Sequence, residues 1–164
     1  MLRNCFSLKK EWEIFIKACF SFLFMDLREK VTQDDIRLMF KEAKSALSQA
    51  YAPLTHFHVG AAVLANTGKI YRGCNIQDPI IDLGICAERA ALAHAISFGA
   101  HYFPAVLIVG EKEKPLYPCG VCCQALLSFR DPASDDMLVI VTKNKEEETQ
   151  FLSLRQLLPH GFTL

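Results

Sequence analysis

The sequence predicts a single α/β domain, a three-layer α/β/α sandwich with a central mixed β-sheet. Helical and strand patterns alternate along the chain, a turn joins two neighbouring strand patterns, and two further runs are apolar throughout. A continuous apolar run is typical of a strand buried on both faces, and such strands need helices above and below the sheet. The 164 residues are 51% hydrophobic and 22% charged, which suits one domain with an adequate core.

The first predicted helix begins near Thr32. Apolar residues over 36–47 recur at spacings of three and four, which gives the helix one apolar face. Thr32 is a suitable N-cap, and Asp34 and Asp35 place negative charge in the first turn. Pro53 disfavours helical geometry at the residue before it, so the helix should end ahead of it.

A β-hairpin and an alternation of helices and strands follow. Two strand-like runs, residues 57–65 and 69–76, flank the turn sequence Asn66-Thr67-Gly68. The later predicted elements are a helix over 86–96 with Gly99 at its C-terminal end, buried strands over 104–110 and 137–142, a helix over 119–129, and a short helix over 151–158 before Pro159.

Residues 1–24 are predicted to be an extension, with the main domain over 25–164. The apolar run at 14–24 is interrupted by Lys17 and is too short for a membrane-spanning helix, and no small-residue cleavage site follows it. Two interpretations remain open. The segment forms an amphipathic helix on the domain or a membrane surface, or the working protein begins at Met25.

A pair of cysteine motifs carries the strongest functional signal. Cys86-Ala87-Glu88 precedes Pro118-Cys119-Gly120-Val121-Cys122. Three thiolates supply three ligands to one Zn²⁺ and leave the fourth tetrahedral position open for water. Glu88, two residues from the first ligand, is placed to move the protons of that water. This arrangement is the pattern of zinc-dependent nucleobase deaminases.

Local structure should favour the thiolate forms of these cysteines. Cys86 and Cys119 are expected at helix N-termini, where exposed N–H groups and the helix dipole stabilise negative charge. Cys122 lies three residues after Cys119, on the same helix face. Arg89 is the candidate cation that offsets the charge of three thiolates on one dication.

Charge and cysteine count restrict the partners and the compartment. Lys and Arg together number 18, and so do Asp and Glu, so the chain lacks the basic excess that is typical of nucleic-acid-binding proteins. We therefore expect a small neutral molecule as substrate. Seven cysteines, three of them candidate ligands, argue against a secreted disulfide framework. Free thiols persist in a reducing compartment, which favours the cytoplasm.

Beyond the cysteine motifs, residues 32–164 resemble the small cytidine deaminases of pyrimidine salvage. The segments that carry the resemblance are Tyr51-Ala-Pro-Leu-Thr-His-Phe-His-Val-Gly-Ala-Ala62, Gly73-Cys-Asn-Ile-Gln77, Leu83-Gly-Ile-Cys-Ala-Glu-Arg89, Pro118-Cys-Gly-Val-Cys122 and Leu157-Leu-Pro159. The resemblance implies hydrolysis of cytidine or deoxycytidine to uridine or deoxyuridine and ammonia. It also implies one Zn²⁺ per subunit and a homotetramer.

The resemblance assigns substrate contacts as well. It implies that Phe57 packs against the base and that the Ala87 amide meets the base carbonyl. Asn75 would hold the ribose, and Gln77 would be a second ribose contact. The family usually has glutamate where Gln77 stands, so we expect weaker sugar binding here.

Three further positions depart from the family. Asp78 stands in place of asparagine, Ile81 in place of a tyrosine near the sugar, and Cys123 in place of an arginine near the metal. These changes leave two alternatives open: a deaminase of another aminated heterocycle or nucleoside analogue, and a zinc-stabilised protein without turnover. Intact Glu88 argues against the second, because a scaffold needs no proton carrier.

Overall fold

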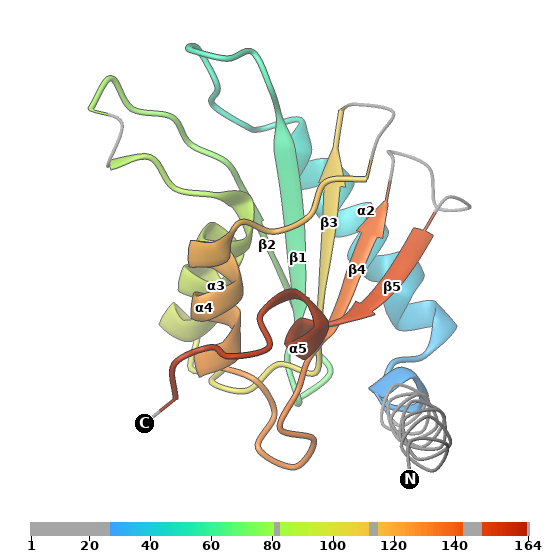
Figure 1. The fold of residues 1–164 in the computed structure, drawn as a ribbon. Coiled ribbons are helices and arrows are strands. Elements are labelled where there is room, and N and C mark those ends of the chain that lie inside the picture. Colours follow the sequence, from blue (N-terminus) through green and yellow to red (C-terminus); the bar gives the residue numbers. More distant parts are fainter. Residues whose placement is uncertain (1–26, 81–82, 112–114, 143–148, 164) are drawn as a thin grey trace, which may run out of the picture.

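The computed structural model describes residues 27–80, 83–111, 115–142 and 149–163, and its centre is a five-stranded mixed sheet (Figure 1). The strand order is β2-β1-β3-β4-β5. β1 pairs antiparallel with both β2 and β3, β3 pairs parallel with β4, and β4 pairs antiparallel with β5. The strands are β1 (Val59–Leu64), β2 (Ile70–Cys74), β3 (Ala105–Gly110), β4 (Leu138–Thr142) and β5 (Thr149–Ser153).

Helices cover both faces of the sheet. The helix α2 (Gln33–Leu47) lies on one face, and α3 (Ala87–Ser97), α4 (Gly120–Ser128) and the short α5 (Leu154–Leu157) lie on the other (Figure 1). Each face buries its own hydrophobic cluster: in β1, Ala62 and Leu64 join the α2 side while Ala61 and Val63 join the α3 side. The predicted α/β/α sandwich is therefore confirmed.

Local signals behave as the sequence predicts at several element ends. Thr32 caps α2 through a capping box with Asp35: its side chain accepts from the Asp35 N–H at 3.1 Å, and the Asp35 carboxylate accepts from the Thr32 N–H at 2.9 Å. Gly68 in the hairpin turn and Gly99 after α3 have φ of 80° and 83°, the left-handed conformation that glycine adopts without strain.

The predicted helix over 151–158 is wrong in its first half. Residues Thr149–Ser153 form the edge strand β5, whose Phe151 pairs with Ile140 of β4, and only Leu154–Leu157 are helical. Apolar residues in this segment recur at spacings that match a helix, but pairing with the free edge of β4 satisfies the backbone groups instead. Ser153 ends the strand and caps α5.

Two glycines bring helix backbones into direct contact with the sheet. A Cβ on Gly73 of β2 would lie 2.2 Å from the Ala91 N of α3, and one on Gly60 of β1 would lie 2.0 Å from the Ala43 O of α2. A side chain at Gly73 would push α3 away from the sheet, so this glycine sets the position of α3.

The N-terminal extension over 1–24 lies outside the described residues. Within the described ranges, no helix has the length and apolar character needed to cross a membrane. At the described N-terminal boundary, Leu27 is buried in the α2-side cluster and the Arg28 guanidinium lies over the Phe151 ring, 4.2 Å from its centroid.

Candidate metal and substrate site

Two helix N-termini bring the three predicted cysteine ligands together. Cys86 is the N-cap of α3 and Cys119 the N-cap of α4, both with extended backbone geometry, and Cys122 lies in the first turn of α4. The three Sγ atoms all lie within 4.8 Å of one another. The expected placement of Cys86 and Cys119 at helix starts is confirmed.

The arrangement of these residues fits a zinc ion. Zinc–thiolate bonds of about 2.3 Å in a tetrahedron place sulfur atoms roughly 3.8 Å apart, so a small adjustment of the cluster would suffice. The Arg89 Nε is buried and has no hydrogen-bond partner among the residues that the structure describes, whereas its Nη2 donates to the Gly84 O at 3.1 Å. A buried cationic donor whose charge acts on Cys86 suits a thiolate there better than a neutral thiol.

Electrostatics favour a thiolate even before metal binds. A hydrogen bond from the Cys122 thiol, assisted by Cys119 and the Arg89 charge, lowers the pKa of Cys86 to about 5 against the opposing effect of burial. The pKa of Cys122 is raised, because it is the donor to Cys86 and because it is buried. The Cys119 Sγ also accepts a hydrogen bond from the Cys122 N–H at 3.5 Å, which caps α4.

Glu88 lies in the first turn of α3 and lines the same pocket as Cys86 and Cys119. Its side chain is almost fully buried, with 5% of the residue exposed. Burial raises the pKa of the Glu88 carboxyl, and the nearby Cys86 thiolate raises it further. A carboxyl group with a raised pKa is suited to both accepting and donating a proton near neutral pH.

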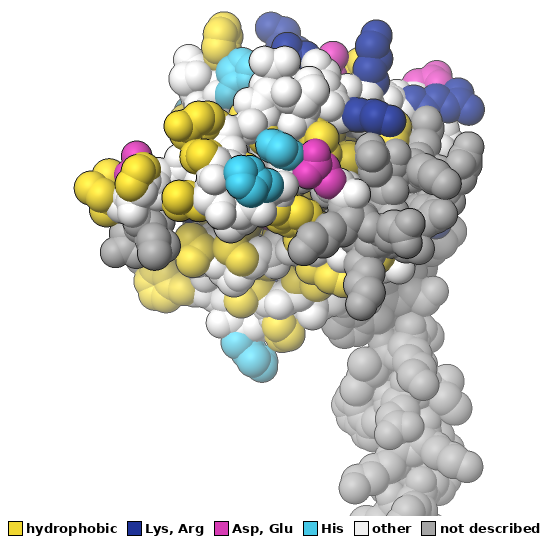
Figure 2. Space-filling model, turned by 90° about the horizontal axis from the view of Figure 1, so that it is seen from above, with side chains coloured by type: hydrophobic (Ala, Val, Ile, Leu, Met, Phe, Trp, Pro, Cys, Tyr) yellow, Lys and Arg dark blue, Asp and Glu magenta, His cyan; other side chains and the backbone are white. Residues whose placement is uncertain are grey.

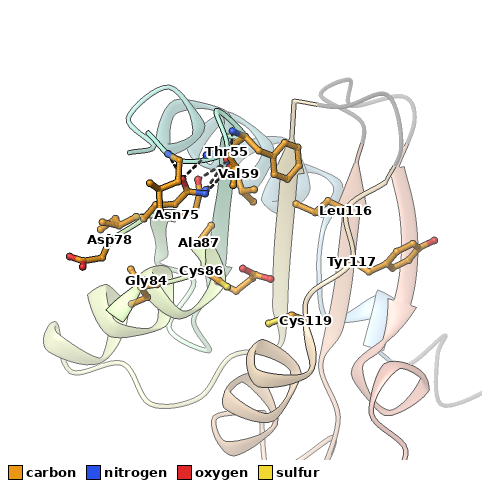
Figure 3. Close-up of a pocket in the computed structure, with 16 residues that line it drawn as sticks. Thr55, Val59, Asn75, Asp78, Gly84, Cys86, Ala87, Leu116, Tyr117 and Cys119 are labelled. Carbon is orange, nitrogen blue, oxygen red and sulfur yellow. Dashed lines mark hydrogen bonds between the residues drawn. The ribbon is translucent and has the colours of Figure 1, made fainter. Parts of the chain in front are cut away.

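These groups lie at the base of a cavity of about 600 Å³. In Figure 3, Cys86, Ala87 and Cys119 occupy the base, Thr55 and Asn75 lie on one side, and Leu116 and Tyr117 lie on the opposite side. A volume of this size accommodates a small organic molecule. The described lining residues include no Lys, Arg or His.

The amide side chains at the open end of the pocket are bonded to the protein itself. The Asn75 Oδ1 accepts from the Val59 N–H at 2.8 Å, and its Nδ2 donates to the Phe57 O at 2.9 Å. The Gln77 Oε1 accepts from the Leu54 and Thr55 N–H groups at 3.0 and 3.1 Å. Both residues line the pocket, as the sequence predicted, and the side-chain amide of each already makes hydrogen bonds within the protein.

The remaining predicted residues take different positions. Phe57 and Ala87 line the cavity, and Ala87 is the first residue of α3, whose N–H has no partner within the helix. Asp78 also lines it, with its Oδ1 accepting from the Ile80 N–H at 2.8 Å. Cys123 is buried away from the lining residues, and burial raises the pKa of its thiol to about 11. Ile81 lies outside the described residues.

Sequence reasoning missed part of the pocket wall. Leu116 and Tyr117 line the side opposite Asn75, and Thr55 connects the Gln77 amide to the wall that carries Phe57. A signal for the first two was present, because they immediately precede Pro118-Cys119 and must lie near a ligand at that helix start. No sequence signal pointed to the contact between Thr55 and Gln77.

Comparisons with known proteins agree with this geometry. Residues 33–134 match the family model described as "Cytidine and deoxycytidylate deaminase zinc-binding region". Cytidine deaminase of Sporosarcina psychrophila is 38% identical over 79% of this chain and 92% of that protein, and that of Halalkalibacterium halodurans is 36% identical over 79% and 95%. The crystal structure of cytidine deaminase from Burkholderia pseudomallei has a TM-score of 0.69 at 35% identity, covering 77% of this chain and 98% of its own.

Proposed function

This chain belongs to the cytidine and deoxycytidylate deaminase family and is a zinc-dependent cytidine deaminase, and within that activity we propose that Cys86, Cys119 and Cys122 hold the zinc while Glu88 carries the protons. One observation supports this assignment above all: a buried glutamate lies beside three clustered cysteine sulfurs at the base of a cavity of about 600 Å³.

The reaction replaces the amino group on the pyrimidine ring with a carbonyl oxygen from water and releases ammonia. A zinc ion held by these cysteines would supply Lewis acidity, which would allow water to lose a proton near neutral pH. Glu88 would take that proton on its carboxylate and deliver it to the ring nitrogen; it would then take the second proton of the same water from the new hydroxyl group on the ring carbon and deliver it to the departing amine, so that the carbonyl forms as ammonia leaves. The burial that raises the pKa of Glu88 helps it hold the proton between these transfers.

The base would be held by groups already around the cavity. Ala87 begins α3 and lines the pocket with Phe57; its N–H would donate to the base carbonyl, and Phe57 would offer an aromatic face to the ring. Arg89 would sit behind the ligands and offset part of the thiolate charge. Asn75 and Gln77 lie at the end of the cavity that would receive the sugar.

The lining chemistry supports a nucleoside rather than a phosphorylated or polymeric substrate. No described lining residue is Lys, Arg or His, while Asp78 and Glu88 are acidic. A phosphate group normally requires cationic or clustered N–H donors. We therefore place cytidine and deoxycytidine ahead of their phosphates and of nucleic acid, and pyrimidine salvage is the corresponding role.

A homotetramer and a cytoplasmic location complete the proposal. Large hydrophobic side chains are exposed on the loops that border the cavity: Tyr51, Leu54, Ile76, Ile80, Leu83 and Tyr117. In Figure 2, hydrophobic side chains gather on one part of the upper face, and Lys and Arg on another. Such a surface favours association between copies of the chain. The five described cysteines are free thiols, which suits a reducing compartment.

The catalytic domain is proposed to span residues 25–164, with 1–24 as an extension. The match to the family model begins at residue 33, and Leu27 is buried in the core. Expression of the full chain and of a version starting at Met25 would compare their zinc content, mass in solution and activity. Native mass spectrometry on both would report the tetramer directly.

A substrate panel tests the proposed activity. Purified zinc-loaded protein is incubated separately with cytidine, deoxycytidine, cytosine, cytidine monophosphate and an aminated nucleoside analogue, and ammonia and the deaminated product are measured. We expect the highest kcat/KM with cytidine or deoxycytidine. Turnover of the analogue alone would favour the second substrate class, and no turnover of any compound by zinc-loaded protein would favour a non-catalytic zinc protein.

A further inference from the structure

The loop that forms one wall of the pocket is fastened to the chain beyond β2 through Gln77. Its Oε1 accepts from the N–H groups of Leu54 and Thr55, and its Nε2 donates to the Thr55 Oγ1 at 2.6 Å. The backbone adds a second attachment, because the Gln77 N–H donates to the Tyr51 O at 2.8 Å. Three side-chain hydrogen bonds from one amide therefore hold this loop.

The hydrogen bonds of Gln77 extend through Thr55 to Phe57, the aromatic residue that lines the pocket. The Thr55 Oγ1 that receives the Gln77 amide also accepts from the Phe57 N–H at 3.2 Å. Between them, His56 has φ of 53°, a left-handed conformation that a non-glycine residue adopts at some cost. The path from Gln77 through Thr55 to Phe57 thus stabilises a tight turn that sets the position of the Phe57 ring.

The hydrogen-bonding capacity of Gln77 shows what remains for a ligand. An amide oxygen has two acceptor positions, and both are taken by backbone N–H groups. An amide nitrogen has two N–H donors, and one of them is directed to Thr55. A sugar hydroxyl that needs an acceptor therefore finds none on Gln77, and only one N–H is left for an acceptor on the ligand.

We propose that Gln77 is a positioning residue, which holds the 54–57 wall so that Phe57 meets the base, rather than an acceptor for a sugar hydroxyl. The inference rests on the proposed function, because it concerns how the cytidine pocket is shaped. It follows that removing the Gln77 amide impairs every substrate that carries the base, whether or not its sugar carries hydroxyl groups.

Two substrates separate positioning from direct sugar contact: cytidine, and 2′,3′-dideoxycytidine, which lacks the 2′ and 3′ hydroxyl groups of the sugar. We expect Gln77→Leu to lower kcat/KM about tenfold for both, mainly through KM, because the lost bonds are neutral and partly exposed. A loss confined to cytidine, with the dideoxy substrate within about twofold of wild type, would overturn the proposal. Gln49→Leu, at an exposed glutamine bonded to Ser48 outside the pocket, is the control.

The conservative variant Gln77→Glu should restore the loop. Its carboxylate can accept both backbone N–H groups, and the Thr55 hydroxyl can turn to donate to it. We expect kcat/KM for the dideoxy substrate to return to within about threefold of wild type. A variant that stays as impaired as Gln77→Leu on this substrate would contradict a role through the loop.

A variant at Thr55 tests the same hydrogen-bonded path, and it remains informative if the Gln77 variant fails to fold. Thr55→Val removes the hydroxyl that links Gln77 to Phe57, and the double variant with Gln77→Leu should be less impaired than the product of the two single effects. Multiplicative effects would count against a shared path.

Amide hydrogen exchange provides a readout independent of turnover. The Leu54 and Thr55 amides should lose protection in Gln77→Leu, and unchanged protection would contradict the proposal even if the protein deaminates cytidine. Absent cytidine turnover by wild type would instead disprove the proposed function, and the exchange result would still decide the role of Gln77.

Discussion

The two ends of the pocket are built in different ways. At the metal end, regular secondary structure does the positioning: two helix N-caps and a first turn gather three sulfurs within 4.8 Å, and Glu88 projects from the same helix as Cys86. At the proposed sugar end, the side-chain amides of Asn75 and Gln77 join loops through hydrogen bonds. The proposed reactive groups are therefore fixed by the helices, whereas the residues proposed to fit the substrate are held by a network of individually weak hydrogen bonds.

This difference leads us to expect that changes at the metal end act on the chemical step and changes at the sugar end act on binding. Helix geometry tolerates little local adjustment, so a lost ligand cannot be replaced by a neighbour. A loop held by several neutral hydrogen bonds can lose one and still populate the working conformation. Variants at the two ends should separate in kcat and KM.

The largest effect is expected when a cysteine ligand is removed. Cys86→Ala, Cys119→Ala and Cys122→Ala should each lose zinc and lower activity by more than about 10³-fold, because water with its ordinary pKa of 15.7 yields little hydroxide at neutral pH. Elemental analysis and thermal unfolding measure metal content and stability, and both should fall together.

Cys123→Ala is the matched control for these variants. Cys123 follows the proposed ligand Cys122 and is buried, yet its thiol is directed to the Pro118 O at 3.6 Å and not to the cluster. It should retain one zinc per chain. Full zinc retention in all three ligand variants would disprove the assignment of the metal end.

Glu88→Gln should have the next largest effect. The amide keeps the shape of the side chain but neither accepts nor passes on a proton, so kcat should fall by about 10²–10⁴-fold with zinc still bound. Steady-state kinetics and zinc analysis on the same preparation check both halves of the prediction. A near-normal kcat in the zinc-loaded variant would exclude the proton-carrying role.

A smaller effect, mainly on KM, is expected at the sugar end. Asn75→Ala removes the bonds to the Val59 N–H and the Phe57 O, both partly buried, and should destabilise the fold by about 1–2 kcal/mol. KM for cytidine should rise several-fold more than kcat falls. A variant that loses kcat at unchanged KM would break the proposed division between the two ends.

The smallest effect is expected at the exposed pair between His58 and Glu111, beside Phe57. The His58 Nδ1 lies 2.8 Å from the Glu111 Oε1, and this hydrogen bond lowers the pKa of the Glu111 carboxyl. A depressed pKa contributes stability above the unfolded-state value of about 4.3, and this contribution is lost as pH falls through the folded-state value.

Glu111→Gln should therefore lower the free energy of unfolding near pH 6 by less than about 1 kcal/mol, because the pair is exposed, and the melting temperature should fall slightly. The difference from wild type should vanish in strong acid. Thermal unfolding measured from pH 6 to pH 2 tests the sign, and a difference that grows as pH falls would contradict the pairing.

The metal end could be predicted from the sequence because its residues lie within short, regular segments. Once helices begin at Cys86 and Cys119, their spacing alone places Glu88 and Cys122. The sugar end could not, because the Gln77 bonds to Leu54 and Thr55 join segments more than 20 residues apart in conformations without a repeating pattern. The edge strand β5 was missed for the same reason: its pairing with β4 is a tertiary contact that outweighs a helix-like apolar spacing.

Gly73 has a consequence for how inactivating variants of this chain should be understood. The residue is outside the lining of the cavity, yet a methyl group there would meet the α3 backbone at Ala91 and Ala87. That helix carries Glu88 and has Cys86 as its N-cap, so its displacement would separate the proposed proton carrier and one proposed ligand from Cys119 and Cys122 at the start of α4. A substitution at Gly73 would thus inactivate the protein as a change in the pocket would, although the residue lies in the sheet. A survey of tolerated substitutions should find position 73 as restricted as the proposed ligand positions.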